Sequence, residues 1–331
     1  MDKNVEGIKM INENNVDFTN TQVLLSPPDP RDYPVSAAAD ILGINIPKDF
    51  EVWQPPVENQ GGAGNCVAQS LANIMECIAH EYGEEHKDYS VGYIFGNPRN
   101  TASDGMYPRE ACEILLKDGD VLRETWECLL GSGLCKTLWQ TQVTEEIKAK
   151  ARKVMAYVRI HTKKEMQAFM LKYKLPVMII AQTDAFKAGM DGRHATVCYG
   201  WISKETWNKC PGKYNDLDEY GYEDLLFTNS WGIGHHNEGR GTCEFKNMEE
   251  IWGVIPMAKI KLTDIKGRWS ETAIEKEVER GTIKGYEDGT FKPTQPITRE
   301  EAAVMFDRSH TATEKKLMEI IKKLEAIERM I

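Results

Sequence analysis

The sequence has no cluster of basic residues and no long apolar run. Its 331 residues include 41 Lys+Arg and 51 Asp+Glu, which gives a formal net charge of −10. Because binding to phosphates needs concentrated positive charge, nucleic acid is not an expected partner. No stretch stays apolar for the roughly 18 residues of a membrane helix, and the first thirty residues lack the basic start and apolar core of a secretory signal. The chain as given therefore predicts neither membrane insertion nor Sec-dependent export.

The cysteines lack the spacing of a metal site. No CxxC pair and no His-Cys ligand pattern occurs, so we expect no zinc, no other metal and no cofactor. A disulfide framework is not demanded either, and free, mostly buried thiols are the simpler expectation. The eight cysteines are Cys66, Cys77, Cys112, Cys128, Cys135, Cys198, Cys210 and Cys243.

The first half of the chain has the pattern of an arm followed by helices. Residues 1–45 contain SPPDPRDYP, whose prolines favour extended or turn conformations, and we interpret them as a wrapping arm or pro-segment. Apolar residues at helical spacing then predict a buried helix that begins at Cys66 and ends at Gly83. Further helices are expected over residues 108–119, 144–154 and 163–173.

From Pro176 the pattern changes to strands. Short β-branched or aromatic runs alternate with Gly, Asn and Asp, which is typical of antiparallel sheet. The runs are PVMIIAQT, HATVCYGWI, DLLFTNSW, GTCEFKN and VIPMAKIKL. A helical half followed by a β half predicts an α+β fold, with a cleft where the two halves meet.

Cys66 stands at a position that suits a nucleophile. A thiol attacks at neutral pH only if its thiolate is stabilised, and the first turn of a helix beside a histidinium does this. The preceding QGGAGN is glycine-rich, so the chain can turn tightly and bring N–H groups towards a substrate carbonyl. Gln60 can add a side-chain donor to the developing oxyanion, together with the Cys66 N–H.

Three strings resemble the active-site motifs of papain-like cysteine proteases. NQGGAGNCVA is similar to the family's NQGxCGSCWA, RHATVCYGW to its histidine strand, and FTNSWG to its asparagine strand. The resemblance covers residues 46–257 and implies a two-lobed fold, a helical lobe beside an antiparallel β-barrel-like lobe. It implies that Cys66 is the nucleophile, His194 its base and Asn229 the group that orients the histidine, with Trp231 shielding their hydrogen bond.

Departures from the family pattern concern the walls of the cleft. Ala63 replaces a cysteine of the motif, so the family's disulfide at that point cannot form, and Val67 replaces the aromatic residue after the nucleophile. His235 stands where a second tryptophan is expected. SDGMYP resembles the wall that hydrogen-bonds an extended substrate, which makes Gly105 and Met106 candidate substrate contacts; a simple Asp-Gly turn is the alternative.

Residues 258–309 resemble one S-layer homology repeat. The match rests on an Asp-Ile start, a tryptophan, the GYEDGTFKP turn and the ITREEAA helix start. It implies binding to a secondary polymer of a bacterial cell wall, with Arg299 and Trp269 as candidate contacts, since a guanidinium pairs well with carboxylate groups. Read without the family, the segment is a helix–loop–helix and Arg299 an ordinary helix residue.

The C-terminal residues 310–331 have the spacing of a short coiled coil. Heptad-like positions hold Leu317, Ile320, Leu324, Ile327 and Ile331. Such a helix can join chains into a homo-oligomer or pack on its own domain. Because the related family presents three repeats and this chain has one, we hypothesise that the tail brings three repeats together.

The sequence therefore predicts a cysteine endopeptidase that acts on protein or peptide substrates and is tethered to a bacterial envelope. One alternative is a cell-wall peptide hydrolase of the same chemistry, and another is an inert wall-binding protein with the arm in its cleft. The absence of a signal peptide leaves localisation open between the cytoplasm and an envelope or virion reached without Sec export.

Overall fold

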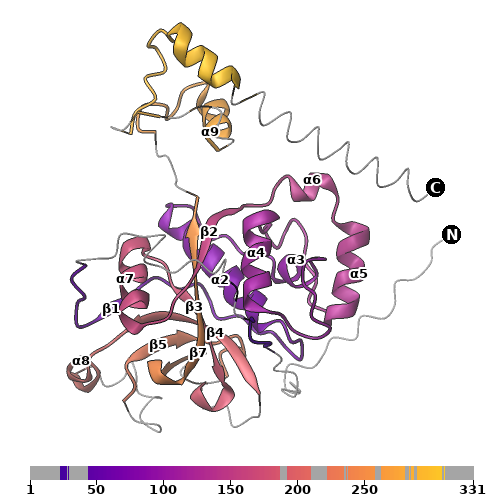
Figure 1. The fold of residues 1–331 in the computed structure, drawn as a ribbon, viewed down its shortest axis with the longest axis vertical. Coiled ribbons are helices and arrows are strands. Elements are labelled where there is room, and N and C mark those ends of the chain that lie inside the picture. Colours follow the sequence, from indigo (N-terminus) through magenta and orange to yellow (C-terminus); the bar gives the residue numbers. More distant parts are fainter. Residues whose placement is uncertain are drawn as a thin grey trace, which may run out of the picture. The chain divides into compact units, whose positions relative to one another are not determined.

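The computed structural model describes residues 23–27, 29, 44–186, 192–209, 222–234, 236, 238–257, 262–279, 283, 285–286, 289–307 and 309. The chain divides into two compact units, Met1–Met257 and Ala258–Ile331. Figure 1 shows that the first unit has the helices of residues 66–148 gathered on one side and the strands, with the helices of residues 163–173 and 204–209, on the other. Among the described residues, no helix has the length and apolar character needed to cross a membrane.

The helical side of the first unit is built around one long helix. Helix α2 (Cys66–Glu81) begins at Cys66, as the apolar spacing predicted. Its side chains are buried on almost every face, because the other helices surround it on one side and the sheet covers it on the other. The surrounding helices are α3 (Val91–Phe95), α4 (Pro108–Lys117), α5 (Ser132–Gln142) and α6 (Glu145–Lys148).

The strands form one antiparallel sheet in the order β2-β7-β3-β4-β5-β6, with β1 (Phe50–Glu51) paired to β4. In the described residues β2 pairs only with β7 and β6 only with β5, so the sheet is open. The α+β papain-like architecture is confirmed, but the barrel-like closure expected for the β lobe is wrong, because a barrel leaves no unpaired edge. The strands are β2 (Val154–Arg159), β3 (Val177–Gln182), β4 (Arg193–Trp201), β5 (Leu225–Thr228), β6 (Arg240–Cys243) and β7 (Met248–Pro256).

Strand β3 shows why the PVMIIA run is continuously apolar. Met178 and Ile180 pack into the core that contains α2, whereas Val177, Ile179 and Ala181 pack into a second core on the opposite face. Helix α7 (Lys163–Tyr173) covers that second face and begins with a capping box. A strand buried on both faces needs apolar residues at every position.

Three elements differ from the expected ones. The helix predicted over 144–154 is the single turn α6, because Arg152 forms an antiparallel bridge with Asp120 and β2 begins at Val154. Helix α5 was not predicted, and β7 begins at Met248 rather than at Val254. The segment between β4 and β5 contains α8 (Lys204–Lys209).

The second unit is a small helical module. It contains helix α9 (Glu271–Glu279) and a helix over residues 299–307. Asp264, which precedes α9, accepts hydrogen bonds from the N–H groups of Phe291 and Lys292, which lie between the two helices in the sequence. The buried core of the module is Leu262, Ile265, Ile274 and Ile283. The predicted coiled-coil segment 310–331 lies outside the described residues.

Candidate active site

Cys66 is the first residue of α2, and its side chain is wholly buried. The positive end of a helix dipole therefore lies at the sulfur. Burial raises the pKa of the thiol to about 11, while the backbone N–H groups of Ala195, Val67 and Cys66 itself act to lower it. The Ala195 contact places the sulfur beside the residue that follows His194 on β4.

His194 and Asn229 are brought together by the pairing of β4 with β5. His194 is the second residue of β4, and Asn229 follows β5 directly. The imidazole Nε2 lies 3.1 Å from Asn229 Oδ1, which also accepts a hydrogen bond from the Ser230 N–H at 2.7 Å. Because an amide oxygen only accepts, Nε2 must carry the hydrogen of this bond. Nδ1 then holds a lone pair, and it has no hydrogen-bond partner among the described residues.

Aromatic rings enclose this imidazole. Trp231 stacks on it with ring centroids 4.2 Å apart and an interplanar angle of 24°, and Phe186 meets it edge-on at 6.0 Å. Burial lowers the pKa of His194 to about 3, although the bond to Asn229 acts in the opposite direction. The ring is therefore neutral and held in one orientation.

No hydrogen bond joins the Cys66 sulfur to His194 Nδ1, since that nitrogen is unpaired among the described residues. With thiol and imidazole both fully buried, the cost of desolvation favours two neutral groups over a thiolate–imidazolium pair. Catalytic hydrogen bonds are often long in ligand-free sites and tighten when substrate binds. Proton transfer from the thiol to Nδ1 would require the two groups to meet in such a bond.

Gln60 is anchored by Ser230, a residue for which no role was predicted. The Gln60 N–H donates to the Ser230 carbonyl at 2.8 Å, and the Ser230 hydroxyl donates to Gln60 Oε1 at 2.6 Å. Gln60 Nε2 donates one hydrogen to the Ala63 carbonyl at 2.9 Å. An amide nitrogen has two hydrogens, so one remains after the bond to Ala63. The serine lies within the FTNSWG string, but only coordinates reveal that it holds the glutamine.

The expected substrate wall is occupied in part by the N-terminal arm. Gly105 and Met106 are both buried. Val23 forms a parallel bridge with Met106, and the Leu24 N–H donates to the Met106 carbonyl at 3.3 Å. The carbonyl of Gly105 accepts a hydrogen bond from Asn100 Nδ2 at 3.2 Å. The Met106 carbonyl, a candidate substrate contact, is thus bound by the arm.

Both candidate polymer contacts of the second unit are exposed. Arg299 lies in the first turn of the helix over 299–307, which is preceded by a capping box between Thr298 and Glu301. Trp269 is 98% exposed, which is unusual for so large an apolar ring. The fold leaves both side chains accessible to a ligand.

Comparison with known proteins matches the second unit to a family and the first unit to a fold. Residues 261–303 match the S-layer homology domain. The chain is 45% identical over 122 residues to a cellulosome-anchoring protein of Acetivibrio thermocellus, which covers 36% of this chain and 27% of that protein. It is 52% identical over 48 residues to the outer membrane protein SlpA of Deinococcus radiodurans, covering 14% of this chain and 4% of that protein. The chain therefore spans only a small part of the length of these relatives.

Two solved structures that resemble the chain are a cysteine protease and a procathepsin. Xylellain, a cysteine protease from Xylella fastidiosa, superposes with a TM-score of 0.56 at 16% identity, over 74% of this chain and 98% of that one. Procathepsin B S9 from Trypanosoma congolense gives 0.54 at 13% identity, over 73% and 88%. The chain thus combines the papain-like cysteine protease fold with an S-layer homology domain.

Proposed function

We propose that the chain is a cysteine endopeptidase tethered to a bacterial cell envelope. The observation that carries the proposal is the meeting of three segments that are distant in sequence. The Ala195 N–H acts on the Cys66 sulfur, and the neighbouring His194 has Nε2 bound to Asn229 and Nδ1 free to accept a proton. These are the roles of nucleophile, base and orienting group in an acyl-transfer site.

The geometry supports a two-step reaction. The Cys66 thiol gives its proton to His194 Nδ1, and the thiolate attacks the carbonyl carbon of a peptide bond. The second hydrogen of Gln60 Nε2 and the Cys66 N–H stabilise the oxyanion. The imidazolium then protonates the leaving amine, and water releases the acyl group from the sulfur. Trp231 keeps water from the bond between His194 and Asn229 throughout.

The buried site represents a latent state in this proposal. Burial sets the pKa of Cys66 to about 11 and that of His194 to about 3, so almost no thiolate exists at neutral pH. Access of solvent removes the largest cause of both shifts, whereas the dipole of α2 continues to favour the thiolate. Opening of the cleft is therefore expected to activate the enzyme.

The S-layer homology domain supplies the tether. Such a domain supports binding to a cell-wall polymer, and one relative is named for anchoring a cellulosome. The exposed Arg299 and Trp269 are the candidate contacts, one for carboxylate groups and the other for a sugar face. Protein or peptide is the proposed substrate.

Covalent labelling tests the enzymatic part. A peptidyl epoxide should add once to the wild-type protein, as measured by intact-protein mass spectrometry. Cys66→Ala should lose the adduct and the hydrolysis of unfolded protein, and Cys112→Ala, which changes another buried cysteine, should keep both. If the protein takes no label even after removal of residues 1–45, the papain-like unit is an inert scaffold. Hydrolysis of purified peptidoglycan but not of protein would instead favour a cell-wall peptide hydrolase.

A further inference from the structure

Residues 58–60 form a short antiparallel ladder with residues 230–232. The Gly232 N–H donates to the Glu58 carbonyl at 3.0 Å, the Gln60 N–H donates to the Ser230 carbonyl at 2.8 Å, and Asn59 bridges to Trp231. The ladder unites two parts of the proposed site. One strand holds the oxyanion donor, and the other follows Asn229 and includes the tryptophan that stacks on His194.

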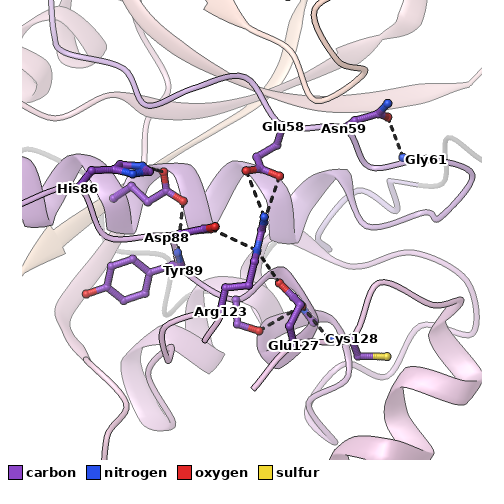
Figure 2. Close-up of polar contacts among 12 residues, drawn as sticks. Glu58, Asn59, Gly61, His86, Asp88, Tyr89, Arg123, Glu127 and Cys128 are labelled. Carbon is purple, nitrogen blue, oxygen red and sulfur yellow. Dashed lines mark hydrogen bonds and ion pairs between the residues drawn. The ribbon is translucent and has the colours of Figure 1, made fainter. Parts of the chain in front are cut away.

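The side chain of Glu58 ties this ladder to a guanidinium. Arg123 Nη1 lies 3.3 Å from Glu58 Oε1, and Nη2 lies 3.1 Å from Oε2, so both carboxylate oxygens are bound. Figure 2 shows this pair between the chain segment that carries Asn59 and Gly61 and the segment that carries Glu127. A bidentate pair of this kind fixes orientation as well as distance.

Arg123 is itself fixed from two other directions. Its Nε lies 3.1 Å from Glu127 Oε2 and 3.2 Å from Asp88 Oδ1, and its own N–H donates to the Asp88 carbonyl at 2.8 Å. Glu127 Oε1 in turn accepts the N–H of Gly92, in the first turn of α3, at 2.7 Å. The guanidinium is therefore anchored in the helical side of the unit, as Figure 2 shows.

We propose that the Glu58–Arg123 ion pair is a positioning device that holds Gln60 in place for the oxyanion, a role that rests on the proposed function. Such a device is needed because a glycine-rich loop follows Gln60. Gly61 has φ +59° and begins the GGAG run, so the chain beyond Gln60 has conformations open to it that other residues rarely adopt. On the N-terminal side of Gly61, the backbone of residues 58–60 is held by the two hydrogen bonds of the ladder. The ion pair adds a rigid link two residues before the glutamine.

The kinetic consequence is specific to the transition state. An oxyanion exists only after attack on the carbonyl, so a misplaced donor lowers kcat and leaves substrate affinity unchanged. Alkylation of the Cys66 sulfur by iodoacetamide forms no oxyanion. Its rate reports the thiol and imidazole alone, and it should not respond to loosening of Gln60.

The test neutralises one carboxylate at a time around the same guanidinium. Glu58→Gln removes the link to the ladder, whereas Asp88→Asn is the matched control, because Asp88 binds Arg123 without touching residues 58–60 or 230–232 in any contact above. The full chain is used, and titration with the epoxide counts its active sites. We expect Glu58→Gln to lower kcat about tenfold, to change KM by no more than about twofold, and to leave the rate of alkylation by iodoacetamide unchanged. Asp88→Asn keeps the Glu58 pair and the bond from the Arg123 N–H to the carbonyl of residue 88, so it should keep the wild-type kcat.

A second measurement reports the stability of the ladder and does not depend on catalysis. Hydrogen exchange of the Gln60 and Gly232 amides should accelerate in Glu58→Gln and not in Asp88→Asn. An active wild type in which both variants behave alike would overturn the inference and leave the proposed function standing. A drop in alkylation that matches the drop in kcat would mean general loss of folded protein and would overturn it too. If the wild type neither takes the label nor hydrolyses peptides, both proposals fall together.

Discussion

Glu76 is a carboxylic acid buried in the middle of the helix that presents Cys66. Its Oε1 accepts the Tyr89 N–H at 3.3 Å, and its Oε2 lies 3.2 Å from His86 Nε2. Figure 2 shows His86 and Tyr89 in the same view as Arg123. Burial raises the pKa of this carboxyl to about 8, and the charges of Asp88 and Glu58 raise it further than Arg123 lowers it. Glu76 is therefore protonated at neutral pH, unlike most glutamates.

Because folding raises the pKa of Glu76, the free energy of unfolding depends on pH. Between about pH 5 and 8 the folded state binds this proton and the unfolded state does not, so the stabilisation is lost as pH rises. Relative to Glu76→Gln, the unfolding free energy of the wild type should fall by up to about 1.4 kcal/mol per pH unit over this window. Urea denaturation followed by tryptophan fluorescence at several pH values measures it.

The control for this prediction is Glu81→Gln, which removes an exposed carboxylate from the same helix. Its stability should follow the wild-type pH dependence. Parallel curves for the wild type and Glu76→Gln would show that the Glu76 carboxyl is ionised in the folded protein, contrary to the expected effect of burial.

At the level of single residues, candidates could be named from local strings, whereas their contacts are visible only in the structure. Cys66, His194 and Asn229 could be found because each stands in a local string with a typical neighbour pattern. Ser230, Glu58 and Arg123 could not, since their roles depend on side chains that meet only after folding. Arg123 stands 65 positions from its partner Glu58, in a segment without any motif.

Elements were predictable where one physical signal dominated. The start of α2 follows from apolar spacing, and the sheet follows from β-branched runs between turn residues. Helix α5 was not predicted although Leu134, Cys135, Leu138 and Trp139 recur at helical spacing, because polar residues and a glycine fill the rest of SGLCKTLWQTQ and few of its side chains are buried. The predicted helix over 144–154 failed because tertiary pairing of Arg152 with Asp120 overrides local helix preference.

The arm is the element with the clearest consequence for activity. Besides the pairing of Val23 and Leu24 with Met106, the Ser26 N–H donates to Glu250 at 2.6 Å and the Ser26 hydroxyl accepts from the Arg109 N–H at 3.1 Å. These contacts tie the arm to both β7 and the start of α4. If Met106 contacts substrate, the arm and the substrate compete for the same carbonyl.

Leu24→Pro tests this competition, because proline has no N–H to donate to Met106. In the proposed enzyme it should raise kcat/KM about fivefold, the factor that corresponds to one hydrogen bond of roughly 1 kcal/mol. Leu24→Ala keeps the N–H and should raise it less. Deletion of residues 1–45 should exceed both. Hydrolysis of a fluorogenic dipeptide measures the effect, and equal activity of all four proteins would exclude an inhibitory arm.

At the scale of the whole molecule, we expect the two units to carry separable functions. The first unit contains every residue of the candidate active site, and the second has its own core of four buried aliphatic residues. The second unit is small and leaves Trp269, Ile297 and Phe306 exposed, as expected of a repeat that normally packs or binds elsewhere. Loss of wall binding should therefore leave the thiol chemistry intact.

Arg299→Ala is the variant that separates tethering from catalysis. Removal of its guanidinium should weaken binding to bacterial walls rich in acidic secondary polymer about tenfold, as for loss of a charge-assisted hydrogen bond. Lys266→Ala removes one positive charge from another exposed position of the module and should bind as the wild type does. Cosedimentation of the full chain with purified walls measures binding, and epoxide labelling of Cys66 should be equal in all three proteins. If Arg299→Ala and Lys266→Ala bind equally well, Arg299 does not contact an acidic polymer. The same follows if the wild type binds undiminished to walls from which acid has removed the polymer.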